Sequence, residues 1–334
     1  MTVSSGPIRI GTRASALARW QADHVAAALA SLPGAPTPEL VLIKTEGDRI
    51  QDVPLSKVQG KAFFTKEIEE ALLENQVDVA VHSLKDLATA MPPGLALGAV
   101  MERADPRDAL LMSPSLSTAA PSSDKTDLSP DDLPPGARVG TSSLRRRALL
   151  KGWRPDLEVV DLRGNVPTRI RKLDEGGYDA VVLAAAGVHR LGLRSRISAY
   201  LPIGTFLPAV SQGAVAVQIR AEDSRVGPWV AALEHGDTRV TTSAERAFLR
   251  RLEGGCQIPV GAFGQLEEGR LHLQGIVASL DGDRRVHGEI NGPLREGERL
   301  GTELAEDLLV RGARGILGEI RGDLEPPEGS RDDG

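Results

Sequence analysis

Short apolar runs alternate with segments of helical periodicity through the first two thirds of the chain. The runs are rich in Val, Ile, Leu and Ala and have the length of buried strands: residues 8–11, 40–44, 77–82, 95–100, 137–140, 157–162, 178–184 and 214–219. Between them, apolar residues recur at helical spacing over residues 15–30, 66–74, 144–151 and 166–173. Strands that alternate with helices are typical of a doubly wound α/β sheet.

The pattern changes towards the C-terminal end. A helical stretch over residues 242–251 is followed, between residues 257 and 290, by three short strand-like runs with Gly- and Asp-rich turns. Another helical segment covers about residues 302–317. The sequence therefore predicts a separate, small α+β domain here, and the length of 334 residues agrees with two or three domains.

Two segments of the α/β part resemble each other. Residues 11–15 (Gly-Thr-Arg-Ala-Ser) and 140–143 (Gly-Thr-Ser-Ser) each follow a predicted strand and open a helix. One interpretation is shared helix capping by Ser and Thr, and the other is a pair of similar lobes facing each other across a cleft. Residues 113–135, between the two segments, are rich in Ser, Pro and Asp without periodicity, so we expect a solvated, mobile connection.

Composition and charge exclude several classes of protein. The 40 basic and 46 acidic residues give a formal charge of −6, which argues against a surface built as a whole for nucleic acid or an anionic membrane. No apolar run approaches the roughly 20 residues of a spanning helix, and the polar start shows no secretory signal. We therefore expect a cytoplasmic protein without a membrane segment.

The basic residues are nevertheless concentrated. Residues 138–171 hold nine cations against three acids, a local charge of +6, so the rest of the chain carries −12. A solvated charged face is the ordinary explanation. The alternative is an anion site, because Thr141 and Ser143 place hydroxyls and N–H groups at a helix start, directly before Arg145 and Arg146. At about 100° per residue, at least one of the three arginines that begin at Arg145 must point away from a shared ligand.

The first α/β part offers a matching set of anion-binding groups. Arg13 and Ser15 lie at its first strand-to-helix turn, and Lys57 and Lys61 lie in a glycine-containing loop. Neither the P-loop spacing nor G-x-G-x-x-G is present, which argues against a nucleotide site. The expected ligand is an anion with several carboxylates or phosphates.

Asp86 and Cys256 are the candidate reactive groups. Asp86 follows the run 77–82, at the edge where open α/β sheets bind ligands. It is either an ordinary surface partner of Lys85, a helix cap, or an ionised carboxylate that stabilises positive charge on a substrate. Cys256 is the one cysteine, and is either a buried apolar thiol or, after two glycines, an exposed nucleophile or attachment point. The six histidines lack metal-ligand spacing, so we expect them to be structural.

Several long blocks, in the right order, resemble the porphobilinogen deaminase (hydroxymethylbilane synthase) family over residues 8–320. The blocks are residues 11–13 (GTR), 47–64, 81–86 (VHSLKD), 102–108 (ERADPRD), 139–146 (VGTSSLRR), 162–166 (LRGNV), 207–209 (LPA), 212–214 (QGA) and 252–256 (LEGGC). The chain departs from the family where glycine is common, at Gln59, Ala62 and Ser211, and where Leu87 and Ala88 replace Val-Pro.

The resemblance implies a fold and a reaction. It implies two doubly wound α/β lobes resembling type II periplasmic binding proteins, formed by residues 1–105 with 212–232 and by residues 106–211, and a small α+β domain over residues 233–334. It also implies a dipyrromethane cofactor, made from two substrate units and joined by a thioether to Cys256. Four porphobilinogens would be added with loss of ammonia, and linear hydroxymethylbilane would then be released by hydrolysis. We expect a monomer, with neither nucleic acid nor membrane as a partner.

The resemblance also implies residue roles. Asp86 would be the catalytic carboxylate. The groups that would bind the acetate and propionate side chains of the pyrroles are Arg13, Ser15, Lys57, Lys61, Ser83, Lys85, Thr141, Ser143, Arg145, Arg146, Arg163, Gly164, Arg169 and Arg190. Fixed cations fit this chemistry, because every pyrrole brings two carboxylates into one cleft. We also expect the growing product to move relative to Asp86, which must serve each reaction centre in turn.

Two other classes of function compete with this one. A solute-binding module of periplasmic-protein type would share the two lobes and the carboxylate-binding cleft, but it needs no cysteine. A polyanion-binding protein would use the basic segment 138–171, but 3% aromatic residues offer little base stacking.

Overall fold

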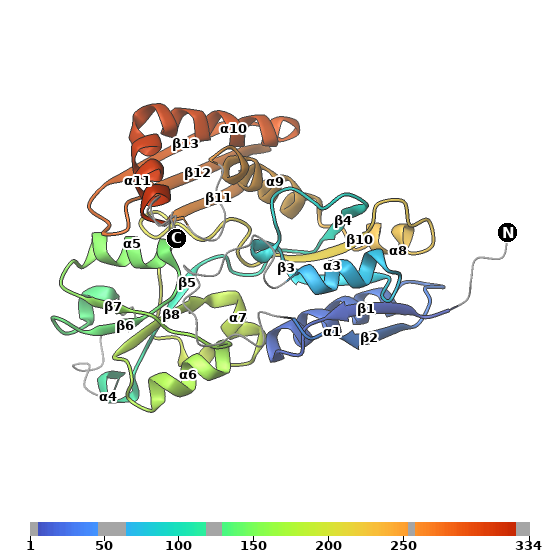
Figure 1. Ribbon diagram of the computed structural model, residues 1–334, viewed down its shortest axis with the longest axis horizontal. Coiled ribbons are helices and arrows are strands. Elements are labelled where there is room, and N and C mark those ends of the chain that lie inside the picture. Colours follow the sequence, from blue (N-terminus) through green and yellow to red (C-terminus); the bar gives the residue numbers. More distant parts are fainter. Residues whose placement is uncertain (1–5, 46–64, 118–128, 253–257, 325–334) are drawn as a thin grey trace, which may run out of the picture.

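The computed structural model describes residues 6–45, 65–117, 129–252 and 258–324. Its strands form three sheets, each with its own helices, as Figure 1 shows. The first two parts are α/β, and the third is α+β. This arrangement confirms the fold class expected from the sequence.

The first sheet has the strand order β2-β1-β3-β10-β4. Its strands are β1 (Ile8–Thr12), β2 (Pro38–Leu42), β3 (Val79–Ser83), β4 (Leu95–Val100) and β10 (Val215–Arg220). β1 pairs in parallel with β2 and β3, whereas β10 is antiparallel to both β3 and β4. The helices of this part are α1 (Ala16–Ala30), α3 (Lys66–Leu73) and α8 (Gly227–Ala231). We call this sheet and its helices the first lobe.

The second sheet repeats this arrangement in the order β7-β6-β8-β5-β9. Its strands are β5 (Asp108–Met112), β6 (Arg138–Gly140), β7 (Glu158–Val160), β8 (Ala180–Ala184) and β9 (Ala199–Tyr200). The helices are α4 (Pro114–Ser117), α5 (Leu144–Trp153), α6 (Val166–Asp174) and α7 (Ala185–Arg190). As in the first lobe, the leading parallel strand is flanked by the next two, and an antiparallel strand follows. The similar segments 11–15 and 140–143 therefore follow equivalent strands of two similar lobes.

The chain passes between the lobes twice, because β5 belongs to the second sheet and β10 to the first. The passages are residues 101–107 and 201–214. Both are tied to the third part by Glu245, whose side chain is fully buried. Its carboxylate accepts hydrogen bonds from Arg103 Nη1 at 2.5 Å in the first passage and from the Ser211 N–H at 2.6 Å in the second.

The third part is a three-stranded antiparallel sheet packed against helices. It contains β11 (Val260–Glu267), β12 (Arg270–Ala278), β13 (Arg285–Pro293), α9 (Gly236–Arg251), α10 (Gly297–Leu308) and α11 (Arg314–Leu324). Phe248, Leu273 and Leu304 are among the side chains that form its own apolar core. The sequence predicted one helix over residues 302–317, but the structure has a kink there, since Gly312, at a φ of 118°, lies between α10 and α11.

Two short strands and three short helices, α4, α7 and α8, escape the sequence prediction. In β5 only four apolar residues follow the charged Asp108, and β9 has two residues, so neither gives a long apolar run. α7 is a single short helix that continues directly from β8. The prediction of a mobile connection over residues 113–135 is wrong for its described ends. Residues 114–117 form α4, and Ser129 caps a 3-10 turn at Pro130–Asp132, where Pro130 is buried.

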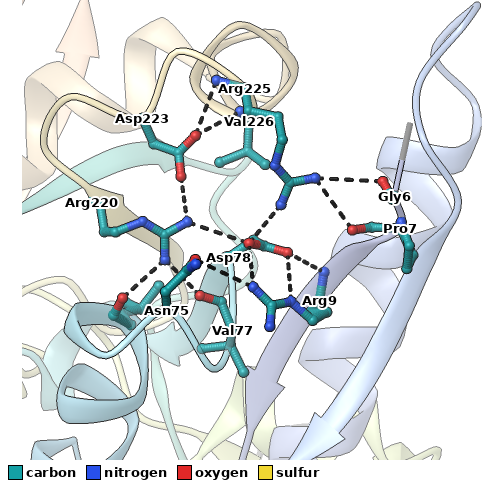
Figure 2. Close-up of polar contacts among 11 residues, drawn as sticks. Gly6, Pro7, Arg9, Asn75, Val77, Asp78, Arg220, Asp223, Arg225 and Val226 are labelled. Carbon is teal, nitrogen blue, oxygen red and sulfur yellow. Dashed lines mark hydrogen bonds and ion pairs between the residues drawn. The ribbon is translucent and has the colours of Figure 1, made fainter. Parts of the chain in front are cut away.

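A cluster of charges closes the edge of the first lobe from which β1 and β3 begin. Figure 2 shows Asp78, which precedes β3, surrounded by Arg9, Arg220 and Arg225. Arg9 donates to Asp78 at 2.9 Å, and Arg225 approaches it to 2.5 Å. Burial raises the pKa of Asp78, but the hydrogen bonds from Arg9 and Arg225 outweigh it and hold this pKa well below its usual range. The cluster joins β1, the start of β3 and the end of β10.

Candidate active site

A pocket of about 80 Å³ opens where β1 and β3 end. It is lined by Arg13, Ser15, Leu17, Ala18, Gln21, Thr65, Val81, His82, Ser83 and Asp86. Ser15 caps α1 by accepting a hydrogen bond from the Ala18 N–H, which leaves its hydroxyl proton available to a ligand. Gln21 stands with residues 11–13 in a block that resembles the family but was not predicted as a site residue, and it donates to Ser83 Oγ at 2.9 Å.

Asp86 lies in this pocket without a hydrogen bond or ion pair to any residue of the described ranges. It ends the 3-10 turn Leu84–Asp86, which follows β3 directly, so it does not cap a helix. Nor does it form a surface pair with Lys85, whose Nζ instead donates to Gln212 Oε1 at 3.2 Å. Within the described ranges, neither the helix cap nor the surface pair expected as ordinary roles of Asp86 is present.

Lys85 is only partly exposed and carries a perturbed charge. Burial lowers the pKa of its ammonium to about 8, although the neighbouring charge of Asp86 raises it in part. An anionic ligand beside Lys85 would restore its ordinary pKa, since an opposite charge favours the ammonium form.

In the second lobe, Thr141 and Ser143 form the corresponding strand-to-helix turn. Ser143 caps α5 by accepting from the Arg146 N–H at 3.4 Å, and Thr141 Oγ1 accepts from the Ser143 N–H at 3.3 Å. Thr141 is fully buried, whereas Ser143 is partly exposed. The turn therefore presents the hydroxyl of Ser143, at the N-terminal end of a helix, to the solvent side.

Arg145 and Arg146 are largely engaged with the protein itself. Both are buried against Asp108, with Arg145 Nη1 at 2.7 Å from one carboxylate oxygen and Arg146 Nη2 at 2.7 Å from the other. They also donate to the Leu207 and Val182 carbonyls. Burial raises the pKa of Asp108, but the charges of the two arginines hold it well below its usual range. Arg147 points elsewhere, to Asp161 at 3.3 Å, as helical spacing requires.

Arg169 and Arg190 differ from Arg145 and Arg146 in that no acidic side chain balances their charge in the described part of the chain. Neither has a carboxylate partner within the described ranges. Arg169 donates to the Gly164 carbonyl at 2.7 Å, and Arg190 donates to the Gly213 carbonyl at 2.7 Å. Burial lowers the pKa of each to about 10, and for Arg169 the charges of Arg146 and Arg163 add to the effect.

Gly164 allows the turn that places Arg163 and Arg169 near each other. Its φ is +115°, and a Cβ at this position would lie 2.6 Å from the Thr168 side chain. Asp86, from the other lobe, partly offsets the lowered pKa of Arg169. The sequence-predicted residues Asp86, Lys85, Arg163 and Arg169 thus belong to one electrostatic environment between the lobes.

Some expected site residues cannot be placed, and others were not foreseen. Lys57, Lys61 and Cys256 lie outside the described residues. Asp108 and Gln212 were not singled out, although both stand in the blocks 102–108 and 212–214 that carry the family resemblance. The role of Asp108 could not be predicted, because its partners Arg145 and Arg146 are distant in sequence and come close to it only in the folded chain.

Among the histidines, His82 lies closest to the candidate site, since it lines the same pocket. His82 is buried and bonded to Gln218 at 3.1 Å, and burial lowers its pKa to about 4. Within the described ranges, no group of His, Cys, Asp and Glu is arranged to hold a metal ion. The same part of the chain contains no helix long and apolar enough to cross a membrane.

Two family models match the chain. "Porphobilinogen deaminase, dipyromethane cofactor binding domain" matches residues 8–227, and "Porphobilinogen deaminase, C-terminal domain" matches residues 240–310. The porphobilinogen deaminase of Pelobacter propionicus is 51% identical over 313 residues, which cover 94% of this chain and 97% of the relative. That of Syntrophomonas wolfei is 49% identical over 315 residues, which cover 94% and 99%.

Solved structures resemble the chain more distantly. A methionine binding protein, MetQ, aligns with a TM-score of 0.43 at 14% identity, covering 69% of this chain and 91% of that protein. A nutrient binding protein from Burkholderia cenocepacia bound to methionine aligns with a TM-score of 0.39 at 16% identity, covering 68% and 89%. The family follows from the sequence matches, which extend over nearly the whole length of relatives that are half identical: the chain belongs to the porphobilinogen deaminase family.

Proposed function

We infer that this chain is a hydroxymethylbilane synthase, a transferase that joins four porphobilinogen units with loss of ammonia and releases linear hydroxymethylbilane. The proposal rests on one observation: within the described ranges, the carboxylate of Asp86 has no hydrogen-bond or ion-pair partner, and Arg169 and Arg190 have no carboxylate partner. A cleft of this kind is electrostatically incomplete without a ligand. It suits a substrate that brings several carboxylates and becomes positively charged during reaction.

The donor groups of the site also fit the cofactor expected of the family. A dipyrromethane carries carboxylates on both rings, and Lys85, Arg169 and Arg190 are partly buried cations able to bind them. We propose that it is joined by a thioether to Cys256. When bound, it supplies the free pyrrole carbon to which the first substrate unit is joined.

The residues of the chain divide the work between binding and charge stabilisation. Arg13, Ser15 and Ser83 line the pocket with Asp86, so they can hold pyrrole carboxylates beside it. Arg163 and Arg169 would hold those of neighbouring rings from the second lobe. Arg145 and Arg146 act mainly through Asp108, by fixing the turn at Ser143 and adding positive potential. Asp86 would stabilise the positive charge that develops when ammonia leaves, and accept the proton released when the new bond forms.

We propose the division of the chain that the sequence suggested: residues 1–105 with 212–232, residues 106–211, and residues 233–334. The two passages between the sheets and the separate core of the third part support it. We also propose that the protein acts as a monomer, as the family resemblance implies. A free thiol reserved for a thioether also favours the reducing cytoplasm.

The replacement Asp86→Asn tests the assigned chemistry. The amide keeps the size of the side chain but removes its charge, so we expect kcat to fall by about 10²–10³-fold or more. Folding and cofactor attachment should persist, as measured by thermal unfolding and by the mass of the purified protein. Turnover within threefold of wild type would remove Asp86 from the central role, whereas a solute-binding module would release no ammonia from porphobilinogen at all.

A further inference from the structure

Gln212 lies at the centre of the second passage between the lobes and is fully buried. Its neighbours Ser211 and Gly213 both have left-handed backbone conformations, with φ values of 62° and 97°. The backbone is thus sharply turned on both sides of Gln212. Its side chain reaches elements of both lobes, from the turn of Lys85 to β5 and α5.

The hydrogen bonds of Gln212 fix which way its amide faces. Nε2 donates to Asp108 Oδ1 and to the Pro106 carbonyl, both at 2.9 Å, and neither acceptor could serve as a donor. Oε1 faces Lys85 Nζ at 3.2 Å and Arg146 Nη2 at 3.4 Å, and both of these groups only donate. A flipped amide would set like against like at all of these contacts, so the orientation follows from the chemistry.

For Lys85, Gln212 provides the one hydrogen bond found in the described part of the chain. A lysine side chain is long and flexible, so an ammonium with no fixed partner would sample many positions. The charges around it are Asp86 on its own turn, Asp108 of β5, and Arg145 and Arg146 of α5. Gln212 is the neutral member of this group, and it connects the lysine next to Asp86 with the buried charges of the other lobe.

We propose that Gln212 is a positioning residue, whose carbonyl oxygen holds the ammonium of Lys85 at the lobe junction so that it binds a pyrrole carboxylate beside Asp86. This inference rests on the proposed function, which assigns Lys85 to substrate binding. It differs from a merely structural role, in which Gln212 only fastens the passage to Asp108 and the Pro106 carbonyl.

A double-mutant cycle on the holoenzyme separates the two roles. The variants are Gln212→Met, Lys85→Met and their combination, with KM for porphobilinogen and kcat as readouts. We expect Gln212→Met to raise KM about tenfold in the presence of Lys85 and less than twofold once Lys85 is methionine. A rise in KM by the same factor in both backgrounds would overturn the inference, because Gln212 would then not act through Lys85. Gln218→Met is the matched control: this buried glutamine bonds His82 and Glu69, so its effect should be equal in both backgrounds.

A second variant covers the case in which Gln212→Met does not fold. Gln212→Asn keeps a neutral amide, so it adds no charge beside Asp108, but it is one methylene shorter and we expect it not to reach Asp108 and Lys85 together. Its KM should rise in the presence of Lys85 and stay unchanged in the Lys85→Met background, and an equal rise in both backgrounds would contradict the positioning role. The proposed function is tested separately in the wild type: if it forms linear tetrapyrrole while the cycle is additive, only the inference about Gln212 fails.

Discussion

At the scale of single residues, the site is defined by which charges have partners. Arg145 and Arg146, the most conspicuous arginines of the sequence, share the carboxylate of Asp108, whereas Arg169 and Arg190 have backbone carbonyls as partners. A partly buried cation without a counter-ion destabilises the empty protein, since its desolvation is not offset. Such an arrangement is expected where a ligand supplies the missing charge.

This reasoning predicts opposite effects of Arg169→Leu on stability and on activity. The variant should lose at least about tenfold in kcat/KM, because a carboxylate loses its bidentate partner. The apoprotein should unfold at the same or a higher temperature than wild type, because an uncompensated charge is gone. Steady-state kinetics and thermal unfolding of the apoprotein measure the two quantities.

Arg171→Gln provides the control on the same helix. Arg171 is exposed and pairs with Glu175 four residues on, so its replacement should change neither quantity appreciably. If Arg169→Leu instead lowers the unfolding temperature and leaves kcat/KM intact, Arg169 is structural.

At the scale of elements, the second passage carries local strain. Ser211 has a φ of 62°, and its buried hydroxyl has no hydrogen-bond partner within the described ranges. We expect Ser211→Gly to stabilise the protein by about 1 kcal/mol, because it relieves both the backbone conformation and the unsatisfied hydroxyl. Urea unfolding measures the change.

The neighbouring Gly213 gives the opposite expectation. A Cβ there would lie 2.5 Å from the Ala104 carbonyl oxygen, so Gly213→Ala should destabilise the protein strongly in the same unfolding experiment. A destabilised Ser211→Gly variant would show that the serine is accommodated without strain and that added chain entropy dominates.

The cluster around Asp78 makes the stability of the first lobe depend on pH. The pKa of Asp78 is lower in the folded than in the unfolded chain. Its contribution to the free energy of unfolding is therefore complete above the ordinary carboxyl pKa near 4 and is lost as the pH falls below that value. Asp78→Asn should therefore cost about 3–5 kcal/mol at pH 7 and clearly less at pH 3. Denaturant midpoints at the two pH values test this, and an equal loss at both would contradict it.

The sequence predicts most of the regular elements but not how they cooperate. Apolar runs and helical spacing identify β1, β3, β4, β10, α1, α3 and α5, because burial dictates their composition. β5 is missed because its apolar run is short, with only four residues after the buried Asp108, whose partners lie more than 30 residues away in sequence. The same non-local pairing conceals Gln212. The position of Asp86 could be predicted, because a strand end followed by a polar turn is a local signal.

At the scale of the whole molecule, charge and connectivity work together. The net charge is −6, yet Lys85, Arg163, Arg169 and Arg190 lie near the junction of the two lobes. In the described part of the chain the lobes are joined by two passages, and both are bonded to Glu245 of the third part. This connectivity allows the lobes to move relative to each other while the third part stays attached to both passages, as a lengthening product requires.

The most direct test of the account is the intact mass of the protein during limiting turnover. We expect wild-type protein to exceed the mass of the bare chain by one dipyrromethane, and to gain up to four equal increments when porphobilinogen is supplied in small excess. Cys256→Ser should lack the first increase. A wild-type mass equal to that of the bare chain, and unchanged after the apoprotein is given porphobilinogen, would contradict the account.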